Sequence, residues 1–441
     1  MTWNRTYIAK SYIKSSLWIV PFVSVLLFWI ISRITHVFGG WLLASRRIDE
    51  ATAFFGLTMA GARSGLETVV TANLSFLVFT FGSLLVAIQV ASGQYTPRII
   101  ATTILQDNPI RFTVGYFVFT LLFSLRVLVK MGDSTVHQFN TFIAGVLGLC
   151  SVIIFLYLID HAARFLRPVS IVYRLGQSGI AVIQSVYPEE AMPPKTGEEP
   201  ALTISADRTV TNADRSGIVL AFDLKGLVEQ AKRANGIIEL KPEVGNFVAV
   251  GEPLFRLYGS AAKIDDKTLR GSVAFGSERT LEQDPTFAFR ILVDIAIKAL
   301  SPAINDPTTA VLAIDQLHRL LRLVGMRHVK NDRFYDEAGE LRLIYRTPNW
   351  RDFVHLACTE IRHCGAGSIQ IVRRMRSMLE NLIKTLPDFR HAELRQQLEL
   401  LDHEIDLHYK SVADRELAKI ADSQGLGGSL GVEPAFRTTT R

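Results

Sequence analysis

Four long apolar runs occupy the first third of the chain, and apolar and polar positions alternate over shorter segments after them. The run from Ser16 to Phe38 contains one charged residue, Arg33, and the run from Thr68 to Pro97 contains none. The run from Gln138 to Ile159 is also uncharged. Because a helix needs about 20 apolar residues to cross the hydrocarbon core of a bilayer, each of these three runs predicts a transmembrane helix.

The fourth run, Phe112 to Val129, is interrupted at Arg126 after 14 uncharged residues. This pattern is typical of a short or tilted span, or of one whose Arg126 faces the protein interior. We therefore predict a membrane α-helical domain over residues 1–168, with about four transmembrane (TM) helices. Their expected bounds are 16–38, 69–91, 112–130 and 138–159.

Basic residues flank these runs unevenly. Arg5, Lys10 and Lys14 precede the first run in the manner of a signal peptide, but the run is too long and no small-residue cleavage site follows it, which favours an uncleaved anchor. With four spans both termini share one side, and that side carries eight basic residues against six in the opposite loops. Since the densest basic flanks, 5–14 and 164–174, fall on it, we expect both termini to be cytoplasmic.

Composition and charge agree with a membrane segment and exclude some classes of partner. The chain of 441 residues is 49% hydrophobic, and its net charge of +6 is local: residues 1–168 carry a net +7 and the remainder −1. A nucleic-acid-binding protein would place its basic excess on a polar face, so we predict no nucleic-acid partner and take the lipid bilayer as the partner. The three cysteines cannot form a disulfide framework and fit a reducing compartment.

Several polar residues lie at membrane depth or at the end of a span. Polar groups cost free energy in the membrane and are often functional, which favours a pore or an interior-facing site. The alternative is that they form hydrogen bonds between helices or extend their polar ends to the membrane interface. The second run also ends in small and polar residues before Pro97, as a water-filled mouth or a simple helix exit would. The candidates are Asn73, Gln89, Ser92, Gln94, Arg98 and Arg126.

The sequence after the membrane domain predicts a soluble α+β region. Residues 169–214 read as an exit helix, around Val169–Tyr187, and a Pro- and Glu-rich linker. Residues 215–258 predict a strand, a helix and a second strand, followed by Gly- and Val-rich turns, a spacing that resembles half of a biotinyl or lipoyl barrel-sandwich domain. Since the Met-Lys-Met sequence of those domains is absent, we expect a small barrel-sandwich-like β module without an attached cofactor.

Residues 259–420 predict a mainly helical domain that begins with a helical hairpin. Asp284 can cap a helix with Pro285 at its first position, Ser301-Pro302 ends that helix, and Asp306 with Pro307 starts the next one, to about Arg327. The polar residues here predict helix caps and turns, or else a subunit contact or ion site at helix N-termini. The members of such a contact or ligand site are Arg279, Gln283, Asp284, Asn305, Asp306, Thr308 and Thr309.

The string Leu-Ser-Pro-Ala-Ile-Asn-Asp-Pro-Thr-Thr-Ala at 300–310, within 279–310, is long and specific. Together with residues 89–98, it resembles the DUF2254 family of bacterial predicted membrane proteins. The resemblance covers most of the chain, including residues 217–257. It implies a multi-pass protein of the bacterial inner membrane with this architecture, and it supplies no catalytic residue.

The last part of the chain predicts further amphipathic helices. His355, Cys358, His363 and Cys364 match no familiar zinc spacing, so we predict no metal site. Residues 365–367, Gly-Ala-Gly, predict a break in the helical region 352–387, and residues 388–420 predict one more helix. Arg373, Arg374 and Arg376 predict a solvated face. Residues 421–441 are Gly-rich and predict a disordered tail.

The sequence contains no Walker A loop, no G-x-S-x-G elbow and no H-E-x-x-H pair, which disfavours an enzyme. We therefore expect no catalytic residues and no cofactor. One interpretation is an oligomeric channel or transport-like protein with a cytoplasmic domain, for which four spans per chain imply a homo-oligomer. The alternative is a membrane-anchored scaffold or sensor without a pore. Neither the ion or small ligand nor the number of subunits follows from the sequence.

Overall fold

The structure, a computed structural model, describes residues 3–44, 58–94, 107–131, 138–165, 167–193, 205–329 and 333–428. The chain forms two compact units. The first, here called the membrane bundle, comprises residues 11–93 and 97–170, and the second, the C-terminal unit, comprises residues 171–441 with 1–10 and 94–96. The first ten residues therefore fold with the C-terminal unit, although the chain then enters the membrane bundle.

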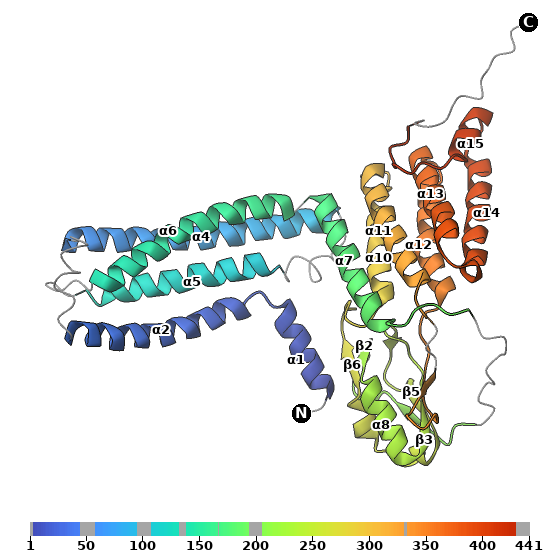
Figure 1. Cartoon of the computed structure of the whole chain (residues 1–441), viewed down its shortest axis with the longest axis horizontal. Coiled ribbons are helices and arrows are strands. Elements are labelled where there is room, and N and C mark those ends of the chain that lie inside the picture. Colours follow the sequence, from blue (N-terminus) through green and yellow to red (C-terminus); the bar gives the residue numbers. More distant parts are fainter. Residues whose placement is uncertain are drawn as a thin grey trace, which may run out of the picture. The chain divides into compact units, whose positions relative to one another are not determined.

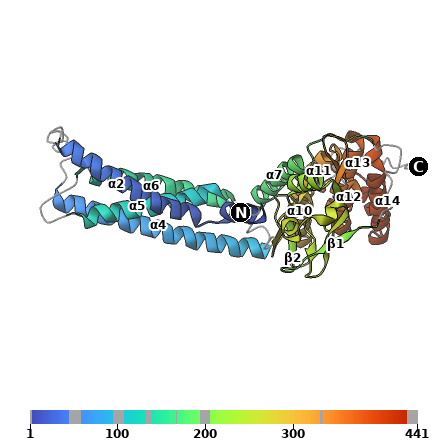
Figure 2. The same cartoon turned by 90° about the horizontal axis from the view of Figure 1, so that it is seen from below.

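The membrane bundle consists of long helices that run side by side in the two perpendicular views of Figures 1 and 2. Over the described residues, three of them are long and apolar enough to cross a membrane: Met59–Val90, Asn108–Val129 and Asn140–Arg164. Among the described residues, the first predicted span contains a shorter apolar helix, Ile19–Ile31, so its crossing of the membrane stays a prediction. The helices are α2 (Ile19–Ala44), α4 (Met59–Gln94), α5 (Asn108–Val129) and α6 (Gln138–Phe165).

Exposed apolar side chains cover the outside of this bundle. Val78 and Leu85 of α4 are each 67% exposed, and Leu149 of α6 is 66% exposed. Large apolar residues in such numbers on the surface of a helical bundle are costly in water and stable in hydrocarbon. The outer surface is therefore built for lipid.

Glycines and aromatic rings bring the helices of the bundle into close contact. Gly148 of α6 lies against Val69 of α4, where an added Cβ would come within 2.6 Å of the valine side chain. The rings of Phe76 and Phe155 stack between the same helices with centroids 4.2 Å apart, and Phe117 of α5 packs against both. Small residues permit this close approach where no hydrophobic effect drives helices together.

The described residues of the C-terminal unit form two sheets around a shared core. The five-stranded sheet has the order β1-β5-β3-β8-β7, with β3 and β8 parallel and its other pairs antiparallel, and the three-stranded sheet has the order β4-β2-β6. Phe222 and Phe255, one from each sheet, lie in that core and are fully buried. The strands are β1 (Arg208–Thr211), β2 (Gly217–Phe222), β3 (Gly236–Leu240), β4 (Phe247–Val248), β5 (Pro253–Gly259), β6 (Val273–Gly276), β7 (Arg333–Tyr335) and β8 (Leu341–Tyr345).

The strand and helix that the sequence predicts near residues 217–234 are present as β2 and α8 (Leu224–Ala234), with Asp223 as N-cap. The sheets are wider than the predicted module at 215–258, because β1 precedes that range and β6, β7 and β8 follow it. The mixed α/β character of the region is confirmed, whereas its likeness to a barrel-sandwich domain is not. Because these strands are far apart in sequence, no local pattern predicts that they pair.

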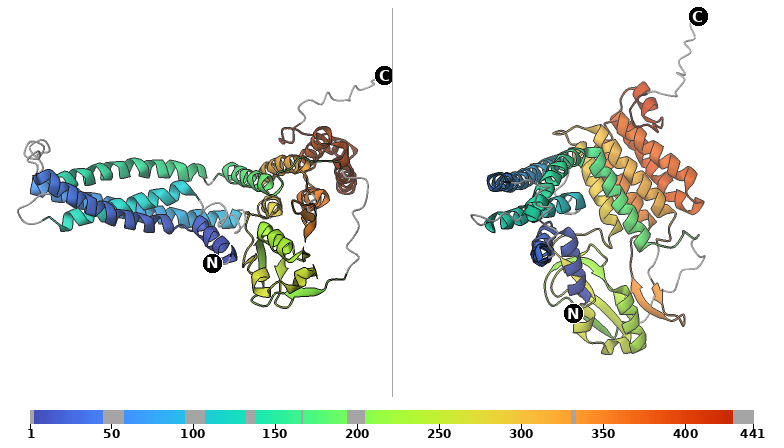
Figure 3. Two further views of the ribbon diagram at one scale, coloured as in Figure 1. Left: turned by 60° about the horizontal axis from the view of Figure 1, so that its bottom comes forward. Right: turned by 60° about the vertical axis from the view of Figure 1, so that its left-hand side comes forward.

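The longer helices between residues 285 and 408 pack side by side, as Figure 3 shows in yellow to red, and the green helix of residues 168–186 lies beside them. Gly176 and Gly179 of α7 fit against α11 and α10, and the predicted break at 365–367 separates α12 from α13. The single helix predicted at 388–420 is instead two helices with a break at 409–411. The helices are α7 (Pro168–Val186), α10 (Pro285–Ala299), α11 (Pro307–Gly325), α12 (Trp350–Gly365), α13 (Ile369–Thr385), α14 (His391–His408) and α15 (Val412–Ala418), with the short α1 (Trp3–Ser15), η2 (Ser260–Lys263), α9 (Asp266–Arg270) and η3 (Asp388–Arg390).

Two predictions about the end of the chain are wrong. Arg373, Arg374 and Arg376 are buried rather than solvated, with Arg373 only 1% exposed. Residues 420–428 are ordered against α13, and we call them the C-terminal strap. The Arg373 guanidinium donates to the carbonyl oxygens of Ile420, Gly427 and Gly428 at 3.0, 3.1 and 2.7 Å. Only residues 429–441 of the predicted tail lie outside the described residues.

Candidate functional site

Asn73 is fully buried between α4 and α6. Its side-chain oxygen accepts a hydrogen bond from the Ser151 hydroxyl at 2.9 Å, and its amide nitrogen donates to the carbonyl oxygen of Val69 at 2.9 Å. The Tyr116 hydroxyl of α5 donates to the carbonyl oxygen of Leu147 near the same place. The buried amide is thus satisfied within one chain, as expected for a contact that joins helices.

The other pore candidates do not gather around Asn73. Gln89 lies on α4 sixteen residues further on and is exposed, because at 3.6 residues per turn this spacing brings it to the opposite face. Arg126 is half-buried in the last turn of α5, where the helix dipole favours a cation. The side chains of Ser92 and Gln94, and the whole of Arg98, lie outside what the structure describes.

Small and polar residues form a stripe on the outward face of α4. Gly61, Thr68, Ser75, Gly82 and Gln89 recur at intervals of seven residues and are all exposed. An added Cβ at Gly82 would meet no atom within 4 Å, so this face is open. We call these five residues the α4 stripe. A seven-residue repeat of small residues is a pattern along which two membrane helices can pack.

A groove opens between α4 and α6 near the start of both helices. It has a volume of about 380 Å³, and Gly61, Gly65 and Gly145 contribute to its lining. Its other lining side chains are mostly apolar, with Thr141 as the hydroxyl. Gly61 belongs both to this groove and to the α4 stripe, so the two features adjoin.

A charged cluster at the other end of the bundle was missed by the sequence reasoning. Asp107 caps α5 by accepting from the Ile110 amide, and its Oδ1 lies 3.0 Å from Nε2 of His161 in α6. Arg111, one turn into α5, is buried and donates to the Ile13 carbonyl oxygen at 3.2 Å. The local sequence Asp-Asn-Pro before an apolar run is an N-cap pattern, so Asp107 could have been identified as a cap.

In the C-terminal unit, Arg279, Gln283 and Asp284 meet where the loop before α10 crosses the sheets. Arg279 donates to the Gly245 carbonyl oxygen at 2.8 and 3.0 Å and lies 3.8 Å from the Asp284 carboxylate. The Gln283 side-chain oxygen accepts from the Phe222 amide at 3.2 Å. Burial raises the pKa of Asp284 above its usual value, because its charged form has lost water. These contacts fasten α10 to the sheets.

Asn305, Asp306, Thr308 and Thr309 lie at the other end of α10. Asp306 caps α11 by accepting from the Thr309 amide at 3.1 Å, as the sequence predicts, and Asn305 adopts a left-handed backbone with φ of 48°. Since α10 has 15 residues, its two ends are about 22 Å apart. The seven predicted residues therefore form two separate clusters and cannot bind one small ligand together.

The His and Cys residues of α12 do not converge. Cys358 is fully buried, and burial raises the pKa of its thiol to about 12, whereas Cys364 is exposed. His363 instead pairs with Glu404 of α14 at 3.0 Å. Within the described ranges, no group of three or more His, Cys, Asp or Glu side chains is placed to hold a metal ion.

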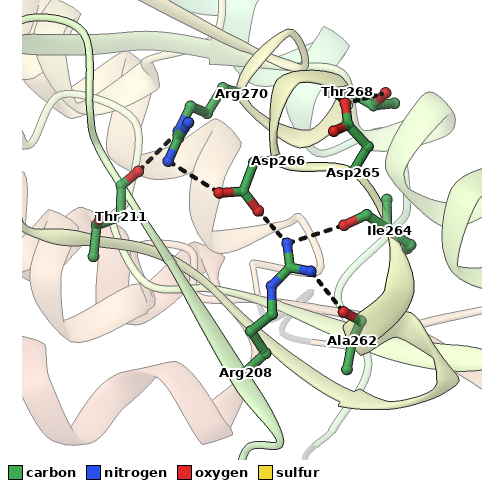
Figure 4. A network of polar contacts seen from close by, with 8 residues as sticks. All are labelled: Arg208, Thr211, Ala262, Ile264, Asp265, Asp266, Thr268 and Arg270. Carbon is green, nitrogen blue, oxygen red and sulfur yellow. Dashed lines mark hydrogen bonds and ion pairs between the residues drawn. The ribbon is translucent and has the colours of Figure 1, made fainter.

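Figure 4 shows a second polar network that the sequence did not reveal. Asp266 is shared by Arg208 and Arg270, and Arg208 also donates to the carbonyl oxygens of Ala262 and Ile264 at 2.7 and 3.0 Å. Arg270 donates to the Thr211 carbonyl oxygen at 3.0 Å. The network ties the edge strand β1 to α9 and has the form of a structural clamp.

Comparisons with known proteins agree with the membrane architecture. An uncharacterized protein of Mycobacterium bovis and one of Mycobacterium tuberculosis are each 25% identical to the chain over 431 residues, which cover 94% of this chain and 81% of the relative. No solved structure matches the chain. The family described as "Predicted membrane protein (DUF2254)" matches residues 14–381, and the chain therefore belongs to this family.

Proposed function

We propose that several copies of the chain assemble in the membrane as a channel or transport-like protein, with a polar path along the α4 stripe between copies. The exposed stripe is the observation that carries this proposal. The proposal places the protein in the bacterial inner membrane with both termini in the cytoplasm, in keeping with its basic flanks. Alkaline phosphatase fused after Arg441 should then be inactive, and an active fusion would contradict the orientation.

The interior of a single bundle supports a path between copies rather than through one chain. The rings of Phe76, Phe117 and Phe155 fill the space between α4, α5 and α6. Asn73 and Ser151, which could have lined an internal path, bind each other. A polar path thus requires the outward face of α4 and a symmetric assembly.

The chemistry of the stripe fits such an interface. Glycine and serine at seven-residue intervals permit close approach of helices, and a polar amide in hydrocarbon needs a partner. In the described part of the chain no hydrogen bond to the exposed Gln89 amide is found. Water or a second copy would satisfy it.

The second candidate function is a membrane-anchored scaffold or sensor without a pore. One observation favours it: the hydroxyls of Thr68 and Ser75 donate to carbonyl oxygens of their own helix at 2.8 and 2.9 Å. Hydroxyls bonded in this way tolerate lipid, so part of the stripe does not demand water.

Single cysteines can separate the two candidates. In a variant lacking Cys150, Cys358 and Cys364, we compare Ser75→Cys and Gly82→Cys with Leu74→Cys, which is exposed but lies off the stripe. A membrane-impermeant thiol reagent should reduce the conductance of proteoliposomes carrying either stripe variant and leave the Leu74→Cys variant unchanged. Conductance no higher than that of empty liposomes, or equal block at all three positions, would favour the scaffold.

A further inference from the structure

One face of α1 is bound to the three-stranded sheet of the C-terminal unit. Trp3 and Tyr7, one turn apart, stack with ring centroids 5.3 Å apart and pack against Leu220, Ala221 and Ala274. The Asn4 amide also donates to the Gly271 carbonyl oxygen at 3.3 Å. This face is therefore used for contacts within the protein.

The opposite face of α1 is exposed and carries apolar side chains together with one basic residue. Arg5, Ile8, Ala9 and Tyr12 project from it at helical spacing, with Ile8 37% and Tyr12 57% exposed. Exposed apolar and aromatic side chains beside a basic residue fit a surface that meets lipid headgroups.

Charge and aromatic residues point to the same partner. Helix α1 contains Arg5, Lys10 and Lys14 and no acidic residue, and the first acidic residue of the whole chain is Asp49. At the C-terminal end of this face, the Trp18 indole donates to the Tyr12 hydroxyl at 3.2 Å, immediately before α2. Trp and Tyr concentrate where a membrane meets water, because their rings are apolar and their polar groups need partners.

We propose that the exposed face of α1 binds anionic phospholipid headgroups. The Arg5 guanidinium meets lipid phosphates, and Ile8 and Tyr12 enter the boundary between headgroups and acyl chains. With the sheet on its other face, α1 binds protein and lipid at the same time. This proposal concerns a surface outside α4 and holds whether or not the protein conducts ions.

A fluorescent probe on α1 tests the proposal in the full-length protein. In the variant lacking the three native cysteines, the probe is attached at Ala9→Cys, and Leu407→Cys on α14, 66% exposed, serves as control. The protein is placed in nanodiscs that contain a headgroup-spin-labelled lipid quencher, in phosphatidylcholine alone or mixed with phosphatidylglycerol. We expect quenching at position 9 to rise with phosphatidylglycerol and to fall in high salt, since salt screens exposed charges. Quenching at position 407 should stay low throughout.

Removal of charge from α1 provides the second arm. Arg5→Gln changes an exposed side chain of this face, and Lys10→Gln changes an exposed side chain of α1 beside it; neither residue belongs to the Trp3–Tyr7 contact, so that contact and folding should be retained. Each should lower the ratio of lipid-bound to free α1 about fivefold in phosphatidylglycerol, and neither should matter in phosphatidylcholine. The proposal would be overturned if quenching at position 9 depended neither on lipid charge nor on either substitution. It would also be overturned if a second copy or another protein shielded the probe at that position.

Discussion

The membrane bundle and the C-terminal unit both have apolar interiors, and they differ most in the side chains that their surfaces expose. In the bundle, Leu149 is 66% exposed while Ser151, two residues later, is fully buried and bonded to Asn73. In the C-terminal unit, α13 buries Arg373 to 1% exposure and its helices hold apolar residues inside. The comparison teaches that the side chains on a surface depend on whether lipid or water surrounds it. One rule holds in both regions: a buried polar group needs a hydrogen-bond partner.

The partners of these buried groups differ in their distance along the chain. Asn73 donates to Val69, four residues away in the same helix, in addition to its bond with Ser151. Arg373 binds the C-terminal strap, 47 to 55 residues away. The amide nitrogen of Asn73 is satisfied within its own helix, whereas its oxygen, like the Arg373 guanidinium, depends on a partner that the tertiary fold brings near.

The largest expected effect is at Arg373. Arg373→Ala should lower the free energy of unfolding of the C-terminal unit by about 3 kcal/mol or more, because three carbonyl oxygens lose a charged donor and a cavity remains. Residues 420–428 should then become accessible to protease. Urea unfolding of the full-length protein in detergent measures the loss, with the exposed Arg395→Ala as control, expected within about 0.5 kcal/mol of the wild type. Equal effects of the two variants would contradict the role of the strap.

An intermediate effect is expected at Asp284. Asp284→Ala removes an N-cap and should cost about 1–2 kcal/mol, against about 1 kcal/mol for Asp306→Ala, which is less buried.

The pH dependence of stability should distinguish the wild type from Asp284→Asn, which keeps a capping side chain but cannot titrate. The pKa of Asp284 is raised above 3.8 in the folded protein, so its protonation favours folding. That contribution is fully present below the ordinary pKa and is lost as pH rises through the raised value. The wild type should therefore gain stability relative to Asp284→Asn as pH falls from neutral toward about 4. A stability difference that does not depend on pH would show that burial does not govern this carboxyl.

The smallest effect is expected inside the membrane bundle. A double-mutant cycle of Asn73→Ala and Ser151→Ala should give a coupling of about 0.6 kcal/mol, since hydrogen bonds between membrane helices are weak and the Ser151 hydroxyl has a second acceptor in the Leu147 carbonyl oxygen. Thermal unfolding of the bundle in lipid nanodiscs provides the measurement. Additive losses would mean that this bond does not hold α4 to α6.

Elements defined by local chemistry were predicted well from the sequence. The caps Asp284 and Asp306 and the break at 365–367 lie where the pattern indicates, because each depends on a few neighbouring residues. The burial of Arg373 was not predictable in this way. The sequence pattern of α13 predicts solvated arginines, because it does not show that residues 420–428 cover Arg373.

The candidate sites show the same limit. Asn73 and Gln89 are both polar residues of one span, yet their spacing turns them to opposite faces, and periodicity alone could have shown this. Asp284 and Asp306 are close in sequence, but a helix of 15 residues separates them. The network around Asp266 joins Arg208 to Arg270 across 62 residues and has no local pattern.

The central claim is that the outward face of α4 meets the same face of another copy in the membrane. The most direct measurement is the spin–spin distance between nitroxide labels at Ser75→Cys in a variant without the native cysteines, reconstituted at low protein-to-lipid ratio. The account predicts a narrow distribution of short distances at Ser75, and longer distances for the matched label at Leu74→Cys. No defined distance at either position, with a single copy per nanodisc by mass, would contradict it.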